Sequence, residues 1–235
     1  MTTVYIISAP SGSGKSTLVN ELRKSVSDLE FSVSYTTRPP RGSEQNGQEY
    51  FFISRPEFER LLAEDALLEH AEVFGNYYGT ARRFLDDARQ RGHDLLLDID
   101  VQGERQVKQK IPDAVNIFIL PPSRKELELR LRRRSQAEGV LSEPGVKKRL
   151  AAARREIENC KNYDYILVND RLEQSIDELK AIVLAERIRR SGKPPSAEEQ
   201  RWLVTAEQHR QANMRPKIKS ILESFGPNPP SDDDV

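Results

Sequence analysis

Ser8-Ala9-Pro10-Ser11-Gly12-Ser13-Gly14-Lys15-Ser16-Thr17 is the stretch of sequence that decides the fold of this chain. It follows an apolar run at residues 4–7 and leads into a helical pattern at residues 17–26. A strand, a glycine-rich turn, Gly-Lys-Ser and a helix in this order are typical of a phosphate-binding P-loop. The backbone N–H groups of such a loop converge on an anion, and the helix N-terminus adds a favourable dipole.

One position departs from the P-loop pattern G-x-x-x-x-G-K-[ST], because Ala9 stands where the first glycine is usual. The later glycines and the Lys-Ser pair keep their spacing, so we still predict a nucleoside triphosphate site. In such a site Lys15 reaches the β- and γ-phosphates, and the Ser16 hydroxyl binds Mg²⁺. The loop residues predicted to bind the triphosphate are Ala9, Pro10, Ser11, Gly12, Ser13, Gly14, Lys15, Ser16 and Thr17.

The composition narrows the class of protein. The 235 residues suit one domain with an appendage, and 37 basic side chains balance 37 acidic ones. This balance gives no sign of a nucleic-acid or anionic membrane partner. No apolar run is long enough for a membrane span, and the first apolar residues are interpreted as a strand, not as a signal peptide. Cys160 is the single cysteine, which excludes an internal disulfide, so we expect a soluble cytoplasmic protein.

Apolar strands alternate with amphipathic helices along most of the chain. Strands are predicted at residues 4–7, 31–35, 95–100, 116–120 and 165–168, and helical patterns follow most of them. Continuous apolar runs are typical of parallel sheets. The alternation therefore predicts an α/β fold with a parallel, doubly wound sheet flanked by helices, and a ligand cleft at the carboxyl ends of its strands.

Two segments break this alternation. Residues 34–80 contain short strands, turns and one helix, and we expect them to form a separate small lobe of mixed β-structure. Residues 191–196 are a linker by composition, residues 197–213 are predicted to form one further helix, and residues 226–235 are polar and proline-rich, which predicts disorder. A loop is predicted at residues 138–145 between two helices.

The small lobe carries two arginines on one rigid loop. Arg38 and Arg41 flank Pro39 and Pro40, and two guanidinium groups held in this way suit forked contacts with a phosphate. Tyrosine hydroxyls can complete such a cage. A P-loop with a second phosphate site indicates an enzyme that transfers a phosphoryl group between two bound substrates.

Several motifs, in order along residues 3–190, resemble those of guanylate kinases. They are Ser-Val-Ser-Tyr-Thr-Thr-Arg-Pro-Pro-Arg (32–41), Gly-Gln-Glu-Tyr-Phe-Phe (47–52), Glu69, Asn-Tyr-Tyr-Gly-Thr (76–80), Leu-Asp-Ile-Asp-Val-Gln-Gly (97–103) and Val-Asn-Asp (168–170). Each is weak alone, but together they are very specific. The chain departs from the family in a stretch between Arg134 and Arg149 that is a few residues longer than usual. A second departure is Gly-Ser-Glu at residues 42–44, where the family usually has any residue, Gly and Glu.

The resemblance implies phosphorylation of GMP and dGMP by ATP with Mg²⁺, as part of purine nucleotide metabolism. It implies that the GMP phosphate binds to Arg38, Arg41, Tyr50 and Tyr78, and the guanine to Ser34, Glu69, Thr80 and Asp100. It also implies that Arg130, Arg134 and Arg149 close over the triphosphate as a lid, that Asn169 contributes to the ATP site, and that Asp98 holds Mg²⁺ through water. The catalytic residues implied are Lys15, Arg41, Arg130, Arg134 and Arg149.

The chemistry of guanine agrees with this assignment. Guanine offers N–H donors that carboxylates accept, and an oxygen that hydroxyl groups serve, so adenine would leave buried polar groups unpaired. The GMP phosphate is itself the nucleophile and is already ionised near neutral pH, so no general base is needed. We therefore nominate none of the histidines, His70, His93 and His209.

The resemblance also implies how the chain is divided. We expect a guanylate kinase-like domain at residues 1–190, with a core of 1–33 and 81–190, a GMP-binding insertion at about 34–80 and a lid at about 124–150, followed by a C-terminal extension at 191–235. The expected partners are ATP and GMP as substrates, with no nucleic acid and no membrane. Assembly into a homo-oligomer is left open.

Each candidate residue also has an ordinary interpretation. Arg38 and Arg41 can be surface charges, Glu69 a solvated acid and Tyr50 a packing residue, while Asp98 or Asp100 can cap the next helix. Two other functions remain as alternatives. One is a phosphopeptide-binding module, which typically lacks the P-loop lysine and the lid arginines, and the other is a kinase for a different phosphorylated acceptor.

Overall fold

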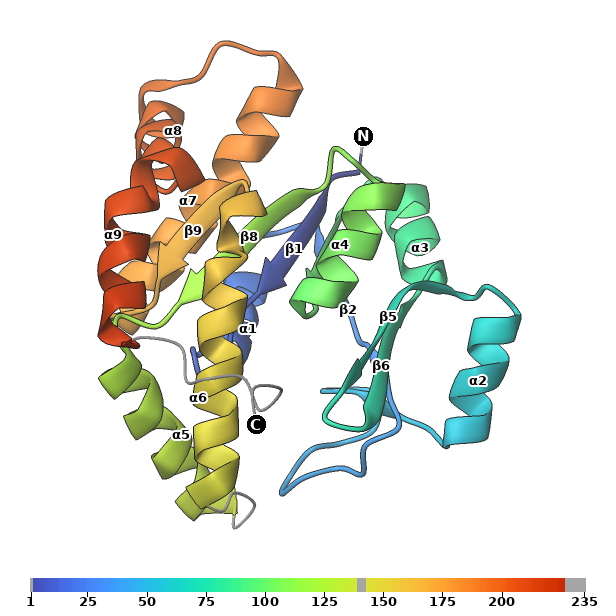
Figure 1. Ribbon diagram of the computed structural model, residues 1–235. Coiled ribbons are helices and arrows are strands. Elements are labelled where there is room, and N and C mark those ends of the chain that lie inside the picture. Colours follow the sequence, from blue (N-terminus) through green and yellow to red (C-terminus); the bar gives the residue numbers. More distant parts are fainter. Residues whose placement is uncertain (1, 139–142, 227–235) are drawn as a thin grey trace.

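The computed structural model describes residues 2–138 and 143–226 (Figure 1). Its central sheet has the order β2-β7-β1-β8-β9, and every pairing within it is parallel. The strands are β1 (Val4–Ser8), β2 (Leu29–Ser32), β7 (Asp94–Asp98), β8 (Val115–Leu120) and β9 (Tyr165–Val168). The prediction of an α/β fold with a parallel sheet is confirmed.

Different helices cover the two faces of this sheet. Tyr5 and Ile7 of β1 pack in one apolar cluster with α1 (Lys15–Ser25) and α7 (Leu172–Ser191). Val4 and Ile6 point the other way and pack with α3 (Arg83–Arg91) and α4 (Val101–Lys110), which Figure 1 shows on the other side of the sheet from α7. Alternate side chains of a strand point to opposite faces, so a strand covered on both sides is apolar at every position.

A second, smaller sheet forms most of the inserted lobe. Its order is β4-β3-β6-β5, with one parallel and two antiparallel pairings. The strands are β3 (Tyr35–Thr36), β4 (Phe51–Phe52), β5 (Leu67–Val73) and β6 (Asn76–Ala81). Helix α2 (Arg55–Ala63) follows β4 and begins with a capping box between Ser54 and Glu57.

The strand predicted at residues 31–35 is wrong as a single element. β2 ends at Ser32 and pairs with β7 of the central sheet, whereas β3 begins at Tyr35 and pairs with β6 of the second sheet. The alternation of apolar and polar residues continues across the break, because both parts are extended. It therefore hides the point where the chain passes from one sheet to the other.

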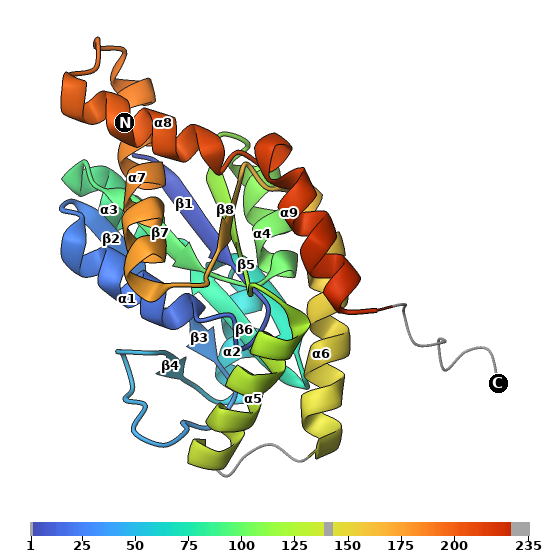
Figure 2. The ribbon, with the colours of Figure 1, turned by 90° about the vertical axis from the view of Figure 1, so that its left-hand side faces the viewer.

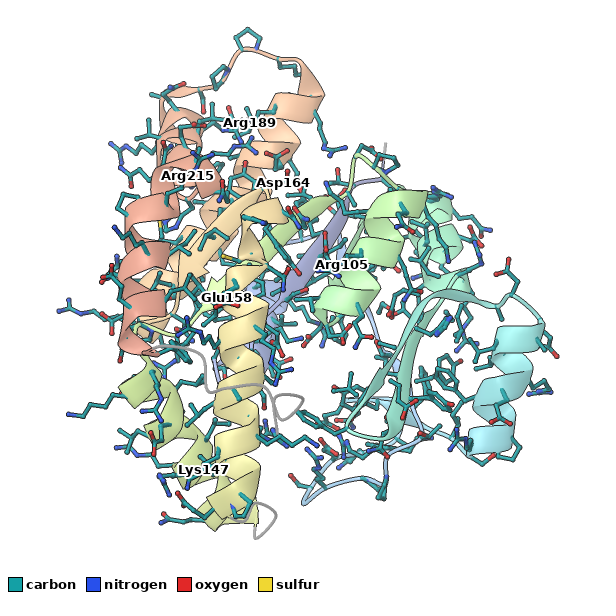
Figure 3. The ribbon with its side chains drawn as sticks, viewed as in Figure 1. Arg105, Lys147, Glu158, Asp164, Arg189 and Arg215 are labelled. Atoms are coloured by element: carbon teal, nitrogen blue, oxygen red, sulfur yellow. The ribbon has the colours of Figure 1, made fainter. Side chains whose placement is uncertain are left out.

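Helices α5 (Arg124–Glu138) and α6 (Glu143–Glu158) form an antiparallel pair at the same end of the molecule as the second sheet (Figure 2). Leu127 and Leu131 of α5 pack with Val146 and Leu150 of α6. Figure 3 shows Lys147 toward the outer end of α6 and Glu158 at the end nearer the central sheet. The loop predicted at residues 138–145 is partly wrong, since α6 already begins at Glu143, and residues 139–142 lie outside the described residues.

The ion pairs of Arg132 add to the contact between these two helices. Its guanidinium donates to Glu128 on its own helix and to both carboxylate oxygens of Glu143 on α6, at 2.6 and 2.7 Å. These contacts raise the pKa of Arg132, with the hydrogen bonds to Glu143 as the largest cause. Arg132 therefore lies on a charged outer face, where its partners are the carboxylates of both helices.

Two helices, and not the single one predicted at residues 197–213, form the described part of the chain end. They are α8 (Ala197–Gln208) and α9 (Gln211–Ser224). The break falls where Ile166 of β9 donates its amide to the carbonyl of His209 at 2.8 Å, and where Tyr165 and Arg210 form an antiparallel bridge. The chain thus pairs briefly with the outer edge strand between the two helices. Disorder was predicted for residues 226–235, and all of these except Gly226 lie outside the described residues.

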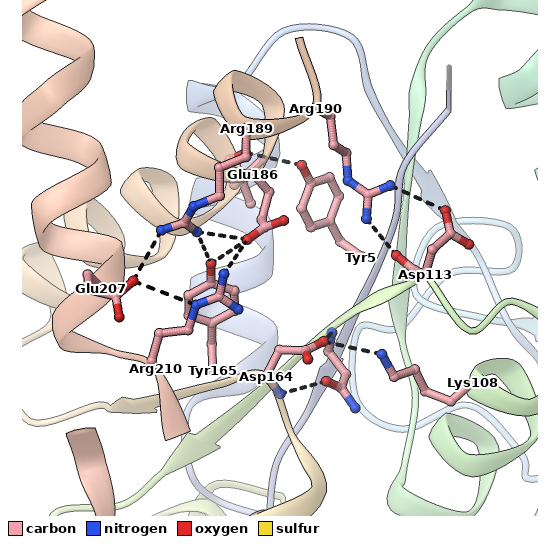
Figure 4. Close-up of polar contacts among 12 residues, drawn as sticks. Tyr5, Lys108, Asp113, Asp164, Tyr165, Glu186, Arg189, Arg190, Glu207 and Arg210 are labelled. Carbon is pink, nitrogen blue, oxygen red and sulfur yellow. Dashed lines mark hydrogen bonds and ion pairs between the residues drawn. The ribbon is translucent and has the colours of Figure 1, made fainter. Parts of the chain in front are cut away.

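A buried polar network holds this end of the chain to the sheet (Figure 4). Glu186 of α7 accepts a hydrogen bond from the Tyr165 hydroxyl, and it also accepts from Arg189 at 2.9 Å and from Arg210 at 3.2 Å. A buried carboxylate is stable only when such partners compensate for its lost water. α9 then covers Phe118 and Ile166 with apolar side chains, among them Ile221. Within the described part of the chain no helix is long and apolar enough to cross a membrane.

Candidate functional site

The P-loop leaves β1 at Ser8 and turns into α1 through two glycines in the left-handed region. Gly12 has φ 92° and Gly14, the N-cap of α1, has φ 89°. A Cβ on Gly14 would lie 2.3 Å from Nδ2 of Asn169, so the loop requires glycine for space as well as for conformation. Asn169 also donates this amide to the carbonyl of Ser13 at 2.8 Å, which braces the loop from the end of β9.

Ala9 is compatible with this loop although the common pattern has glycine there. Its φ is not among the positive values of the described residues, so the position does not need the freedom of glycine. The Ala9 methyl group packs against the apolar cluster between the sheet, α1 and α7. The departure from the pattern therefore leaves the phosphate-binding turn intact.

Lys15 and Asp98 form an ion pair at the mouth of the loop. Parallel pairing sets Ile7 beside Asp98, so the ends of β1 and β7 bring the lysine and the carboxylate together. The Lys15 ammonium also lies 3.4 Å from the carbonyl oxygen of Ile99. The side chains of Lys15 and Asp98 are only 21% and 18% exposed. Water therefore screens the positive charge of Lys15 only weakly, and its field at the loop is strong.

The oxygen donors near the loop fit a divalent cation that arrives with a triphosphate. Ser16 is exposed in the first turn of α1, beside Lys15, and Asp98 supplies a carboxylate at the end of β7. Among residues 2–138 and 143–226, no group of three or more His, Cys, Asp or Glu side chains could hold a metal alone. Mg²⁺ is commonly held by one or two protein oxygens together with water and substrate phosphates. These donors are therefore of the right kind and number for Mg²⁺.

Two lid arginines reach the P-loop. Arg130 of α5 donates to the carbonyl of Ser13 at 3.4 Å and to that of Asn169 at 3.0 Å, while Glu126 fixes its Nε at 2.9 Å. Arg149 of α6 donates to the hydroxyl of Ser11. Arg134 lies one helical turn beyond Arg130 on α5, with its side chain exposed.

The phosphate cage proposed for the inserted lobe is centred on Arg38, which is only 5% exposed. Its guanidinium donates to both oxygens of Glu44, at 2.8 and 3.0 Å, and lies 5.3 Å from the centre of the Tyr50 ring. Burial lowers the pKa of Arg38, but hydrogen bonds with Glu44 and Tyr78 outweigh this effect and the net pKa is raised. Arg41 lies on the same loop, and its amide also donates to Glu44, at 2.8 Å. The lobe thus holds a permanent buried cation beside two tyrosines.

A second group of polar side chains comes from three segments of the chain. The hydroxyls of Ser34 and Thr80 lie 3.1 Å apart, and Glu69 is paired with Thr80 in the β5–β6 hairpin. Glu69 is only 2% exposed. The pKa of Glu69 is raised to about 7, with burial as the largest cause; hydrogen bonds from Thr80 lower it, and the nearby charge of Asp100 raises it. Two carboxylates and two hydroxyls therefore lie close together in one polar cluster.

Asp100 is the N-cap of α4 and accepts from the amides of Gln102 and Gly103 at 3.0 and 2.9 Å. Its ordinary interpretation as a capping residue is therefore confirmed. The amide of Gly103 holds the Asp100 carboxylate, and Gly103 itself lies against Glu69, since a Cβ on this glycine would be only 2.3 Å from Oε2 of Glu69. The two carboxylates are therefore held near each other. The helix that follows β7 thus approaches the second sheet closely at this glycine.

Three residues of the site received no role from the sequence. Glu44 binds Arg38 and Gly103 makes room for Glu69; both stand in stretches that were compared with the family, but those stretches did not indicate these contacts. Glu156 lies on arginine-rich α6, where an acid is expected to be solvated. Burial raises the pKa of Glu156 to about 7, and the charge of Asp100 acts in the same direction while that of Lys15 opposes it. No sequence pattern indicated that this acid lies near the site.

Comparisons with known proteins give a consistent result. The family model described as Guanylate kinase matches residues 1–186, which include the P-loop, the second sheet and the α5–α6 pair. A guanylate kinase from Koribacter versatilis is 60% identical over 223 residues, 95% of each chain. The guanylate kinase of Escherichia coli K12 is 49% identical over 191 residues, 80% of this chain and 90% of that one. The crystal structure of guanylate kinase from Anaplasma phagocytophilum is similar with a TM-score of 0.65 and 38% identity, covering 79% of this chain and 86% of that chain.

Proposed function

The chain belongs to the guanylate kinase family, whose members phosphorylate GMP with ATP, and we propose that it transfers the γ-phosphoryl group of ATP to GMP and to dGMP with Mg²⁺ as cofactor. The observation that carries the substrate assignment is the polar cluster formed by Ser34, Glu69 and Thr80 of the inserted lobe and by Asp100 at the start of α4. Glu69 and Asp100 are fixed acceptors for two N–H donors, and the Ser34–Thr80 hydroxyl pair can donate to a carbonyl oxygen. Guanine carries this set of groups, whereas adenine and pyrimidines do not.

Arg38, Arg41, Tyr50 and Tyr78 are proposed to hold the phosphate of GMP. Nε of Arg38 is buried without a hydrogen-bond partner among the described residues, so the guanidinium retains donor capacity for an oxyanion. Phenol hydroxyls of the two tyrosines can donate to the same anion. This phosphate is the nucleophile and is ionised near neutral pH, so the protein has to position it and not to deprotonate it.

The triphosphate of ATP is proposed to bind to residues 9–17, with Asn169 bracing the loop. Lys15, Arg130, Arg134 and Arg149 then surround the group in transfer with positive charge, which stabilises the charge that spreads over its oxygens in the transition state. Ser16, and Asp98 through water, would hold Mg²⁺, which neutralises phosphate charge when it is bound. Arg41, although on the GMP side, is included in this catalytic set because it aligns the attacking phosphate.

We also propose that the chain is divided into a guanylate kinase-like domain at 1–190 and an extension at 191–235. The family model ends at residue 186, near the end of α7, whereas the match with the relative from Koribacter versatilis is long enough to include α8. We further propose that the protein acts in the cytoplasm, where its substrates occur. Both substrates are small molecules, and neither a nucleic acid nor a membrane has a part in the reaction.

An ADP-release assay over a panel of acceptors tests this proposal. The purified protein is given ATP and Mg²⁺ with GMP, dGMP, AMP, UMP or a ribose phosphate in turn. We expect turnover with GMP and dGMP and at least about 10²-fold lower kcat/KM with AMP and UMP, because the wrong base leaves buried carboxylates unpaired. Preferred use of another acceptor would contradict the base assignment, and no turnover with any of them would favour a binding module.

A further inference from the structure

Phe74 lies at the tip of the β5–β6 hairpin and contacts the lid across the molecule. Its side chain is 52% exposed, yet the centre of its ring lies 5.4 Å from Nζ of Lys148 and 5.6 Å from the guanidinium carbon of Arg149. Both cations belong to α6, whereas the hairpin belongs to the second sheet (Figure 1). The ring therefore links two parts of the molecule that are far apart in sequence.

The backbone conformation of Phe74 is unfavourable for a large side chain. Its φ is 51°, and it is followed by Gly75 with φ 80°. Glycine or asparagine adopts such a conformation at less cost, and a bulky residue there is uncommon. Burial does not compensate, because more than half of the side chain is exposed. An exposed aromatic residue kept in a strained turn indicates a role outside the folding of the hairpin.

The same Arg149 that faces the Phe74 ring also donates to the Ser11 hydroxyl of the P-loop. An arginine beside an aromatic ring within about 6 Å is attracted by the electron-rich face of the ring. Phe74 thus supports from one side a guanidinium that touches the phosphate-binding loop on the other. Lys148 lies near the same ring, so substituting Lys148 or Arg149 in turn can show which cation the ring acts on.

We propose that Phe74 is a positioning residue, whose ring holds the Arg149 guanidinium at the P-loop and so couples the position of the GMP-binding lobe to the triphosphate site. Glu69 and Thr80 lie on the same hairpin as Phe74, so a bound purine and the ring are carried by one two-stranded unit. When that unit moves with GMP, the ring moves with it and Arg149 follows. This inference rests on the proposed function, because it needs Arg149 to act on ATP.

Three substitutions at Phe74 test this proposal without adding strain to the backbone of the hairpin. Phe74→Asn removes the ring and tolerates positive φ, Phe74→Leu keeps an apolar group without an aromatic face, and Phe74→Tyr keeps the face. Val204→Asn is the matched control, since Val204 is also 52% exposed but lies on α8. We expect about two- to fivefold lower kcat/KM for ATP at saturating GMP in Phe74→Asn and Phe74→Leu, the range of one exposed cation–π contact. The affinity for GMP measured without a triphosphate should stay unchanged, and Phe74→Tyr and Val204→Asn should behave as the parent.

A double-mutant cycle identifies the partner of the ring. In an Arg149→Met background Phe74→Asn should have little further effect, whereas in a Lys148→Met background it should keep its full effect. The affinity for a non-hydrolysable ATP analogue, measured with and without GMP, adds a readout independent of turnover. GMP should improve this affinity less in Phe74→Asn than in the parent.

The outcomes separate this inference from the proposed function. If the parent phosphorylates GMP but Phe74→Asn and Phe74→Leu match it in kcat/KM and in the effect of GMP on analogue affinity, the inference is overturned and the function stands. Full additivity of Phe74→Asn with Arg149→Met would overturn it as well. A parent that does not phosphorylate GMP would instead overturn the proposed function.

Discussion

Lys15 has a partner before any nucleotide arrives, and this contact has a consequence for mutagenesis. The lysine is paired with Asp98 at the ends of two neighbouring parallel strands. In the proposed mechanism a triphosphate gives the ammonium group further anions, so its charge is needed for the reaction and not for the fold. Asp98 keeps partial exposure to water, so it can tolerate the loss of its partner.

Lys15→Met is therefore expected to lower kcat by at least about 10²-fold while the protein stays folded, because one fixed donor to the phosphates is lost. Steady-state ADP release with GMP measures the effect, and circular dichroism with thermal unfolding checks the fold. Lys24→Met is a suitable control, since Lys24 lies on the same helix with a side chain that is 70% exposed. A Lys15→Met protein with near-parental kcat would contradict the role of the loop.

The Glu69 carboxylate is proposed to bind guanine, but its burial lowers the stability of the folded protein. Its pKa is raised to about 7 in the folded protein, mainly by burial. At pH 8 the folded state must hold this carboxylate charged in a buried place, which lowers stability. Below the pKa that Glu69 has in the unfolded chain, the carboxyl group is protonated in both states and this loss of stability disappears.

Glu69→Gln should consequently raise the free energy of unfolding by about 3 kcal/mol at pH 8, given 1.36 kcal/mol for each pKa unit. This corresponds to a rise in Tm of roughly 6–12 °C for a chain of this size. The gain should shrink as the pH falls from 7 to 5, and kcat/KM for GMP should fall by at least about tenfold. Thermal unfolding as a function of pH measures the gain in stability, with Glu72→Gln on the exposed face of β5 as the control. A Glu69→Gln protein less stable than the parent at pH 8 would disprove this account of the raised pKa.

At the scale of elements, the apolar pattern predicted the central sheet well and the chain end poorly. β1, β7 and β8 are buried along almost their whole length, which leaves clear runs of apolar residues in the sequence, whereas the edge strand β2 is only partly buried. α9 gave no such signal, because Pro216 lies inside it and only some of its side chains are buried. A proline normally argues against a helix interior, and tertiary packing overrides that preference here.

Because α9 covers part of the core, its apolar residues should contribute to the stability of the whole protein. Ile221 is 1% exposed and packs with Phe118 and Ile166 in one cluster. Ile221→Ala should lower the free energy of unfolding by about 2–5 kcal/mol, as other large-to-small changes in cores do. Denaturant unfolding measures this change, and Val204→Ala on the exposed side of α8 should have little effect. An unchanged midpoint for Ile221→Ala would show that α9 does not stabilise the core.

At the scale of the whole molecule, the residues of the candidate site come from two sheets and from the α5–α6 pair. The chain passes from β2 into β3 and returns from β6 into α3, so the inserted lobe is attached to the central sheet by two crossings. Motifs in the sequence led to an assignment of residues to each half of the candidate site, and this assignment stays a prediction. Their contacts could not be predicted, since Glu44 on Arg38, Gly103 against Glu69 and Arg149 on Ser11 depend on how separate elements pack.

The central claim is that a purine monophosphate bound in the inserted lobe faces a triphosphate held by the P-loop. A crystal structure with GMP and a non-hydrolysable ATP analogue tests this claim most directly. The account predicts guanine hydrogen-bonded to Glu69 and Asp100, its phosphate on Arg38, and the triphosphate in the turn formed by Gly12 and Gly14. A structure with the triphosphate bound but with GMP elsewhere, and no purine beside Glu69 and Asp100, would contradict it.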